Sequence, residues 1–150
     1  MTLFYKFKKE KLDDGTMVIR PRILVAIRGE STTIEVPALI DTGCDTTVIP
    51  EGIARIIGIS LEGKHETLYA YREATEVVES KASITFIGKA NRESVTCTIP
   101  VLIAISKQGI IDECDITLGI SGIFDVFDIT FKKTENKIIC QKVTKIPRLG

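Results

Sequence analysis

The chain has 150 residues, 44% of them hydrophobic, which suits one folded domain with a sizeable core and excludes a disordered tail. Its 20 basic residues balance 20 acidic residues, which removes the electrostatic case for binding nucleic acid or a membrane surface. No apolar tract reaches the roughly 18 residues of a membrane-spanning helix, and the first residues lack the apolar stretch of a signal peptide. These features predict a cytoplasmic protein whose partners include neither a membrane nor nucleic acid.

Most of the chain predicts β-strands, because short runs rich in β-branched and aromatic residues alternate with turn signals. In Ser83–Ile87, for example, Ile84 and Phe86 fall on one face. Leu3–Phe7 also alternates apolar and polar side chains, and a hairpin is expected before residue 23. In chain order, the expected strands cover residues 17–19, 23–27, 33–40, 66–71, 76–87, 95–105, 116–118, 128–131 and 137–142.

Helix is scarce in this sequence. The best candidate covers residues 50–58, because a proline lies near its start and a glycine at its end. Ile53, Ile56 and Ile57 fall on one face of it at helical spacing and are expected in the core. A second short helix is expected over residues 123–127. The whole pattern predicts an all-β fold, a closed or partly closed barrel of many short strands with one or two short helices.

The most informative segment couples an apolar strand to an acidic residue at its end, Ala38-Leu39-Ile40-Asp41-Thr42-Gly43. A carboxylate at the buried end of a strand is costly unless partners satisfy it or function requires it. Gly43 allows the backbone to turn sharply and to approach the carboxylate closely. With the Thr47-Val48-Ile49-Pro50 run that follows, the segment resembles the active-site loop of the retropepsin-like aspartic proteases, which have a single lobe. The alternative interpretation is a tight turn stabilised by an aspartate side chain.

A second segment supports this resemblance. Ile116-Thr117-Leu118-Gly119, followed by residues 120–125, is similar to the strand and short helix near the C-terminus of retropepsins. In that family the strand passes behind the catalytic loop and packs against it. The resemblance therefore gives the glycine at position 119 a steric reason, since a side chain there would meet the loop that holds Asp41.

The position after this glycine departs from the family. Retroviral enzymes usually have an arginine there, which pairs with the acidic residue that corresponds to Asp45, whereas this chain has Ile120. The resemblance implies that Asp45 helps to hold the main chain of a substrate. The substitution either weakens that role or implies another partner for Asp45, such as Arg55 or Arg72.

The resemblance implies peptide-bond hydrolysis by a pair of carboxylates. Two carboxylates at hydrogen-bond distance cannot both ionise, so one polarises the substrate carbonyl while the other takes a proton from water. The motif occurs once, and Asp13-Asp14-Gly15 lacks a preceding apolar strand, so the pair must come from Asp41 of two chains. We therefore predict a homodimeric aspartic endopeptidase that cleaves peptide or unfolded protein, is inhibited by pepstatin, and uses no metal or organic cofactor.

The same resemblance assigns roles beside Asp41, making Asp41, Thr42 and Gly43 the candidate catalytic residues. Thr42 would turn its hydroxyl across the subunit interface and brace the loop of the partner. The backbone N–H of Gly43 would reach the carboxylate. Cys44 replaces the small alanine or serine that is usual at the next position, and it is small enough to keep the geometry of the loop.

The flap of the family corresponds to residues 66–78, which predict two β-rich arms around a polar centre. These residues contain no glycine, unlike the flap tips of retroviral enzymes. With Asp45, the candidate substrate-binding residues are Tyr71, or alternatively Tyr69, and Arg72. The alternatives are cross-strand packing for the tyrosine and a solvated turn for the charged tip.

Other functions are compatible with the residues. Ile120 and the glycine-free flap are compatible with a catalytically weak or inactive module of the same fold, used for binding or dimerisation. Cys44 suggests a thiol enzyme as a further alternative, but His65 is the only imidazole and no Cys–His signature surrounds it. The four cysteines lack the paired spacing of a zinc site and are expected as free thiols in a reducing compartment.

One domain is expected over residues 1–150, with an N-terminal hairpin extension at 1–22 and a retropepsin-like core at 23–142. In retroviral proteases the terminal strands of two subunits interleave in one sheet. Here Leu3–Phe7 and residues 138–143 are β-prone. They pair either across a two-fold axis or at the barrel edge of their own subunit.

Overall fold

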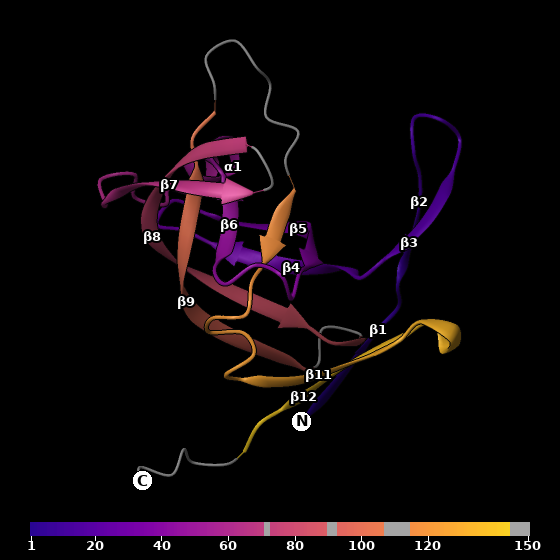
Figure 1. Cartoon of the computed structure of the whole chain (residues 1–150). Coiled ribbons are helices and arrows are strands. Elements are labelled where there is room, and N and C mark those ends of the chain that lie inside the picture. Colours follow the sequence, from indigo (N-terminus) through magenta and orange to yellow (C-terminus); the bar gives the residue numbers. More distant parts are fainter. Residues whose placement is uncertain (71–72, 90–92, 107–114, 145–150) are drawn as a thin grey trace, which may run out of the picture.

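The computed structural model describes residues 1–70, 73–89, 93–106 and 115–144 (Figure 1). The described strands form three sheets of seven, three and two strands, beside one α-helix. In chain order the elements are β1 (Thr2–Tyr5), β2 (Lys8–Lys11), β3 (Met17–Arg20), β4 (Arg22–Arg28), β5 (Thr33–Ile40), β6 (Thr47–Pro50), α1 (Glu51–Ile57), β7 (His65–Ala70), β8 (Glu73–Ile87), β9 (Ser94–Ala104), β10 (Ile116–Leu118), β11 (Phe127–Lys132), the 3₁₀-helix η2 (Lys133–Glu135) and β12 (Lys137–Lys142).

The largest sheet closes into a barrel. Its strands run in the order β4, β5, β10, β6, β9 and β8, and β8 pairs again with β4, which joins the two ends. Strand β7 continues outward from β8 as the second arm of a hairpin. Closure leaves few unpaired backbone groups at sheet edges, as all-β folds require. The predicted all-β barrel is therefore confirmed.

The alternation of apolar and polar residues along the strands determines which side chains face the inside and the outside of the barrel wall. Ile84 and Phe86 on β8 point inward and are fully buried, as their shared face predicted. Thr85 lies between them on the outer face, where its hydroxyl hydrogen-bonds to that of Thr96 on β9 at 2.8 Å. The inward side chains form one continuous core, so the alternation of side chains along each strand determines which residues fill the barrel interior.

Helix α1 begins after Pro50 and ends at Gly58, which adopts a left-handed conformation and donates its N–H to the carbonyl of Ala54. Ala54 and Ile57 are fully buried, but 64% of the Ile56 side chain is exposed. The prediction that Ile56 lies in the core is therefore wrong. The face toward the core is centred on Ala54 and Ile57, which are three residues apart, whereas Ile56 lies about 100° around the helix from Ile57 and turns outward.

Residues 121–126 form successive turns, so the helix predicted over 123–127 is wrong. Two hydrogen bonds of helical spacing form, with the N–H groups of Phe124 and Phe127 as donors. Gly122 before them has a φ of +84°, which interrupts the helical path. Phe127 is already the first residue of β11, so sheet pairing takes the residues that a helix would need.

The two ends of the chain meet in a second sheet of order β1-β12-β11 (Figure 1). Leu3 lies opposite Cys140, and both side chains are buried. On the other side of β12, Ile129 of β11 pairs with the same Cys140. Of the two arrangements that the sequence allowed, the described chain shows the terminal strands paired within one subunit.

Strands β2 and β3 form a separate two-stranded hairpin that projects from the barrel (Figure 1). Its turn is closed by Asp14, whose side chain accepts the backbone N–H of Thr16 at 2.8 Å, and by Gly15, which has a φ of +89°. The hairpin expected before residue 23 is thus present. Neither α1 nor η2, the helices that the structure describes, has the length and apolar character of a membrane crossing.

We expect the ring pair of Phe86 and Phe127 to hold the terminal sheet on the barrel, since their centroids lie 4.8 Å apart and both are buried. Phe127→Ala should lower the free energy of unfolding by about 3–5 kcal/mol. Phe131→Ala on the same strand, where the ring is 38% exposed, should cost about 1 kcal/mol or less. Urea denaturation followed by circular dichroism measures both, and equal losses would contradict this packing.

Candidate active site

Asp41 follows directly on the last residue of β5, at the point where β10 runs beside it. Its backbone N–H donates to the carbonyl of Leu118 at 3.0 Å, in line with the parallel pairing of Leu118 and Ile40. Its side-chain Oδ1 accepts the backbone N–H of Gly43 at 2.9 Å. The strand pair therefore fixes the backbone, the loop fixes the carboxylate, and the half-buried side chain still reaches the surface.

The loop after Asp41 is a tight turn with little room for side chains. The N–H of Cys44 donates to the carbonyl of Asp41 at 3.2 Å. A Cβ atom added to Gly43 would lie 3.2 Å from Oδ1 of Asp41, so a larger residue there would crowd the carboxylate. Thr42 and Gly43 are both exposed, which leaves the tip of the loop open to solvent.

The chain crosses behind this loop immediately after β10. The N–H of Ile120 donates to the carbonyl of Cys44 at 2.9 Å, and the N–H of Ser121 donates to that of Asp45 at 2.8 Å. A Cβ atom added to Gly119 would lie 2.5 Å from a backbone carbon of Thr46. The steric reason predicted for glycine at this position is therefore confirmed.

Thr47 also holds the crossing segment behind the loop in place, and the sequence did not predict this role. Its fully buried hydroxyl accepts the N–H of Gly119 at 3.1 Å. The available signal was a hydroxyl residue at the start of an otherwise apolar strand, where a buried polar group needs a partner. That partner lies 72 residues away, which strand periodicity does not indicate.

No protein-family model matches this sequence, and no curated protein matches it in sequence. Solved structures do match. A retropepsin-like aspartic protease from Rickettsia conorii superposes with a TM-score of 0.54 at 16% identity, over 91% of this chain and 95% of that chain. The retroviral protease-like domain of Ddi1 from Leishmania major superposes with a TM-score of 0.52 at 12% identity, over 81% of this chain and 87% of that chain.

The fold is retropepsin-like. Within this retropepsin-like fold the β7–β8 hairpin forms the two arms that were predicted for the flap, with Ala70 opposite Glu73. Tyr71 and Arg72, the candidate substrate-binding residues between them, lie outside the described residues. Tyr69, the alternative to Tyr71, is 78% exposed.

Asp45 is exposed beside the loop, and Ile120 behind it is 41% exposed. Arg55, which was suggested as a partner for Asp45, instead bonds through Nε to Glu51 at 2.7 Å on its own helix. Arg72, the other suggested partner, is not described. The retropepsin-like loop is thus present, whereas the described residues supply no cation at the side chain of Asp45.

A cavity of about 870 Å³ opens beside the barrel wall, between the β4–β5 turn, the residues after α1, and strands β8 and β9. Thr46 lines it from the far side of the loop, but Asp41 does not. Its rim mixes cations such as Arg28 and Lys81 with carboxylates such as Glu79. We assign the candidate active site to the loop and not to this cavity, because the retropepsin resemblance points to Asp41 and Asp41 does not line the cavity.

The thiol of Cys44 has partners that do not suit a nucleophile. Its Sγ donates to the carbonyl of Thr46 at 3.0 Å. Burial raises the pKa of Cys44 and the neighbouring carboxylates of Asp41 and Asp45 raise it further, which outweighs a hydrogen bond with Thr46. His65 bonds through Nδ1 to Glu76 at 2.8 Å, so the described contacts contain no Cys–His pair.

We expect Gly119→Ala to loosen the crossing behind the loop. The new methyl group meets the backbone of Thr46, and such overpacking costs about 1–3 kcal/mol of unfolding free energy. Gly52→Ala is the matched control, because a Cβ atom there meets nothing within 4 Å and alanine is about 0.5–1 kcal/mol better than glycine in a helix. Thermal unfolding of the two variants should move in opposite directions, and a stabilised Gly119→Ala protein would contradict the crossing.

The raised pKa of Cys44 predicts slow alkylation. At pH 7.5 a thiol whose pKa is raised holds less thiolate than in the unfolded chain, so iodoacetamide should modify Cys44 more slowly in the native protein than in urea. Mass spectrometry of the peptide that contains Cys44 measures the rate. Faster alkylation in the native protein would show an activated thiol and would support the thiol-enzyme alternative.

Proposed function

We propose that this chain is a homodimeric aspartic endopeptidase. It hydrolyses peptide bonds by a water molecule activated between two Asp41 carboxylates, one from each subunit. The observation that carries the proposal is the position of Asp41, half-buried at the end of β5 in a retropepsin-like fold, with Oδ1 held by the N–H of Gly43.

The need for a second subunit follows from the chemistry. One carboxyl group must donate a proton to the substrate carbonyl while another, ionised, removes a proton from water. Among the described residues, no other carboxylate hydrogen-bonds to that of Asp41. An isologous dimer places two identical loops against each other and supplies the missing group.

The remaining residues would bind the substrate. An extended peptide would lie beneath the β7–β8 hairpin and hydrogen-bond through its main chain, as strands added to a sheet edge do. Asp45, Tyr71 and Arg72 would line this path, and Thr42 would brace the loop of the partner. The described cysteines Cys44, Cys97 and Cys140 are free thiols, which supports a cytoplasmic location.

A binding or dimerisation module without activity is the second candidate. The observation that favours it is Ile120, which is 41% exposed at the position where retroviral enzymes carry the arginine that pairs with the residue corresponding to Asp45. A panel of unfolded proteins, incubated from acidic to neutral pH with and without pepstatin, separates the two. Cleavage blocked by pepstatin supports the enzyme, and inertness at every pH supports the module.

Asp41→Asn should reduce peptide cleavage at least about 100-fold, because the amide neither accepts a proton from water nor donates as an acid. Glu135→Gln, which removes a carboxylate from the exposed η2 turn, is the control and should keep the parental rate. A tenfold excess of the Asp41→Asn chain, mixed with the parent, should also suppress cleavage by forming mixed dimers. Parental activity in the mixture would contradict the shared pair, and parental activity of the variant alone would exclude the mechanism.

A further inference from the structure

We propose that the β2–β3 hairpin is a docking arm whose exposed face binds a second copy of this chain. The inference rests on the proposed function, since it names the surface by which the two subunits recognise each other. The hairpin is a good candidate because it projects from the barrel and yet is held firmly at its base (Figure 1).

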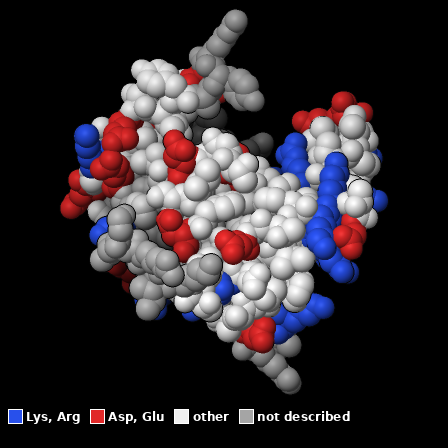
Figure 2. Space-filling model, turned by 60° about the horizontal axis from the view of Figure 1, so that its bottom comes forward, with Lys and Arg blue, Asp and Glu red and all other residues white. Residues whose placement is uncertain are grey.

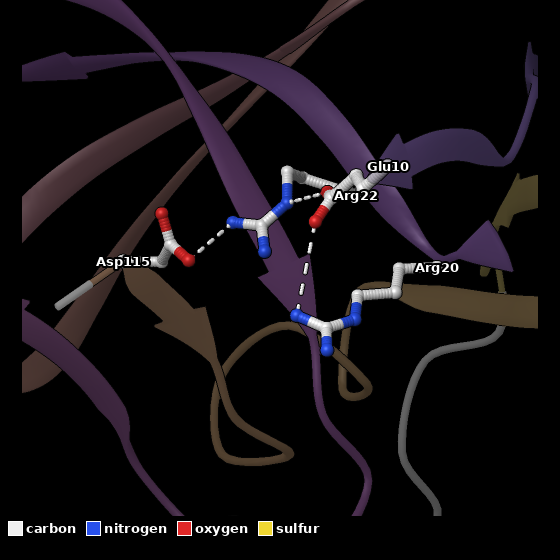
Figure 3. Close-up of polar contacts among 4 residues, drawn as sticks. All are labelled: Glu10, Arg20, Arg22 and Asp115. Atoms are coloured by element: carbon white, nitrogen blue, oxygen red, sulfur yellow. Dashed lines mark hydrogen bonds and ion pairs between the residues drawn. The ribbon is translucent and has the colours of Figure 1, made fainter. Parts of the chain in front are cut away.

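The base of the arm is fixed by a buried cation (Figure 3). Arg22, the first residue of β4, has a side chain only 6% exposed, and its Nε bonds to Glu10 on β2 at 2.5 Å. Its Nη1 bonds to Asp115, just before β10, at 2.7 Å. Glu10 also meets Arg20 on β3 at 3.7 Å. Burial lowers the pKa of Arg22, but the two carboxylates raise it by more, so the charge and both ion pairs are kept.

Beyond its base the arm has one face without a partner in the described chain. Glu10 and Val18 pair across the hairpin and are half-buried against the body. The opposite face pairs a lysine with an apolar residue twice, and the side chains of all four residues are exposed: Lys9 with Ile19, and Lys11 with Met17. An isolated two-stranded hairpin is only marginally stable in water, so a surface that covers these apolar side chains stabilises it.

The strands of the arm are basic. Strands β2 and β3 carry four basic residues and one acidic residue, Glu10, a net charge of +3, and the turn between them carries Asp13 and Asp14. Figure 2 shows Lys and Arg side chains along the projecting hairpin, with Asp and Glu side chains at its tip and over the body of the same face. The basic strands of the arm and the exposed acids of the body are complementary between two copies of one chain.

The position of the arm suits this pairing. The carbonyl of Pro21, between the arm and β4, accepts the N–H of Ile40 at 2.9 Å, so the base of the arm lies beside the residue that precedes Asp41. A two-fold axis that brings two Asp41 loops together therefore brings both arm bases close to it. Each arm, with strands of about 14 Å, then extends over the partner, whose loop is flanked by the exposed acids Asp45 and Asp125.

The terminal sheet supports the same conclusion. Strand β12 is already paired on both sides, with β1 and β11 of its own chain. A strand of the partner therefore cannot be inserted beside β12, and the edges of this sheet are β1 and β11. The arm is a projecting element that offers both charge and apolar area.

Sedimentation equilibrium of the full chain tests the arm. Lys9→Glu with Lys11→Glu should raise the dimer dissociation constant at least about tenfold, because it places four carboxylates of the two arms against the exposed acids of the partner. The control, Lys81→Glu with Lys89→Glu, makes the same charge change at two exposed lysines of β8 and its end, and should stay within about twofold of the parent. Equal circular dichroism melting curves show that both variants fold.

The outcomes separate this inference from the proposed function. If the arm variant dimerises like the parent, the arm is not the docking surface, although cleavage that depends on Asp41 would still stand. Retained dimerisation with lost binding to phosphatidylserine vesicles or to DNA would assign the basic face to a polyanion and overturn the inference. If the arm only docks, the variant regains the parental cleavage rate at concentrations well above its own dissociation constant. A parent that is monomeric at all concentrations overturns both.

Discussion

The structure depends on the insertion of β10 between β5 and β6. This strand has three residues, runs parallel to β5 and antiparallel to β6, and closes the barrel between them. Its last carbonyl receives the N–H of Asp41, and Gly119, the next residue, passes against the backbone of Thr46. So short a strand cannot hold its own register, and its two ends are fixed by Arg22 through Asp115 and by the hydroxyl of Thr47.

The same crossing explains how a carboxylate can end a buried strand. Desolvating a charged group without partners is costly, and Asp41 avoids this cost by taking one hydrogen bond from Gly43 while staying half-exposed. The loop tip faces solvent, so in the proposed mechanism one subunit presents half of a reaction centre at its surface. The fold buries its core on one side of Asp41 and leaves the other side open for the second carboxylate that this mechanism requires.

The parts that local pattern governs were predictable. The alternation of apolar and polar residues predicted the strands, and the proline and glycine at its two ends predicted α1. The apolar strand followed by Asp41 and Gly43 predicted the loop. The predictions failed or were incomplete where contacts with residues distant in the sequence determine the local structure. Residues 123–127 were expected as a helix because their local composition allows one, but β12 takes Phe127 into a sheet. The roles of Thr47 and Arg22 depend on partners brought together by the barrel, which the spacing along the sequence does not reveal.

Arg22 links the two parts of the molecule that a dimer would use. Buried ion pairs rarely stabilise a fold more than well-packed apolar residues would, because desolvation offsets most of the attraction. What these ion pairs do provide is a fixed orientation, since one planar guanidinium binds a carboxylate from β2 and one from the residue just before β10. The orientation of the hairpin is therefore tied to the strand that positions Asp41. A change that moved the arm would therefore also shift β10 and the Asp41 loop. The proposed docking of the subunits and the geometry of the candidate site both depend on Arg22.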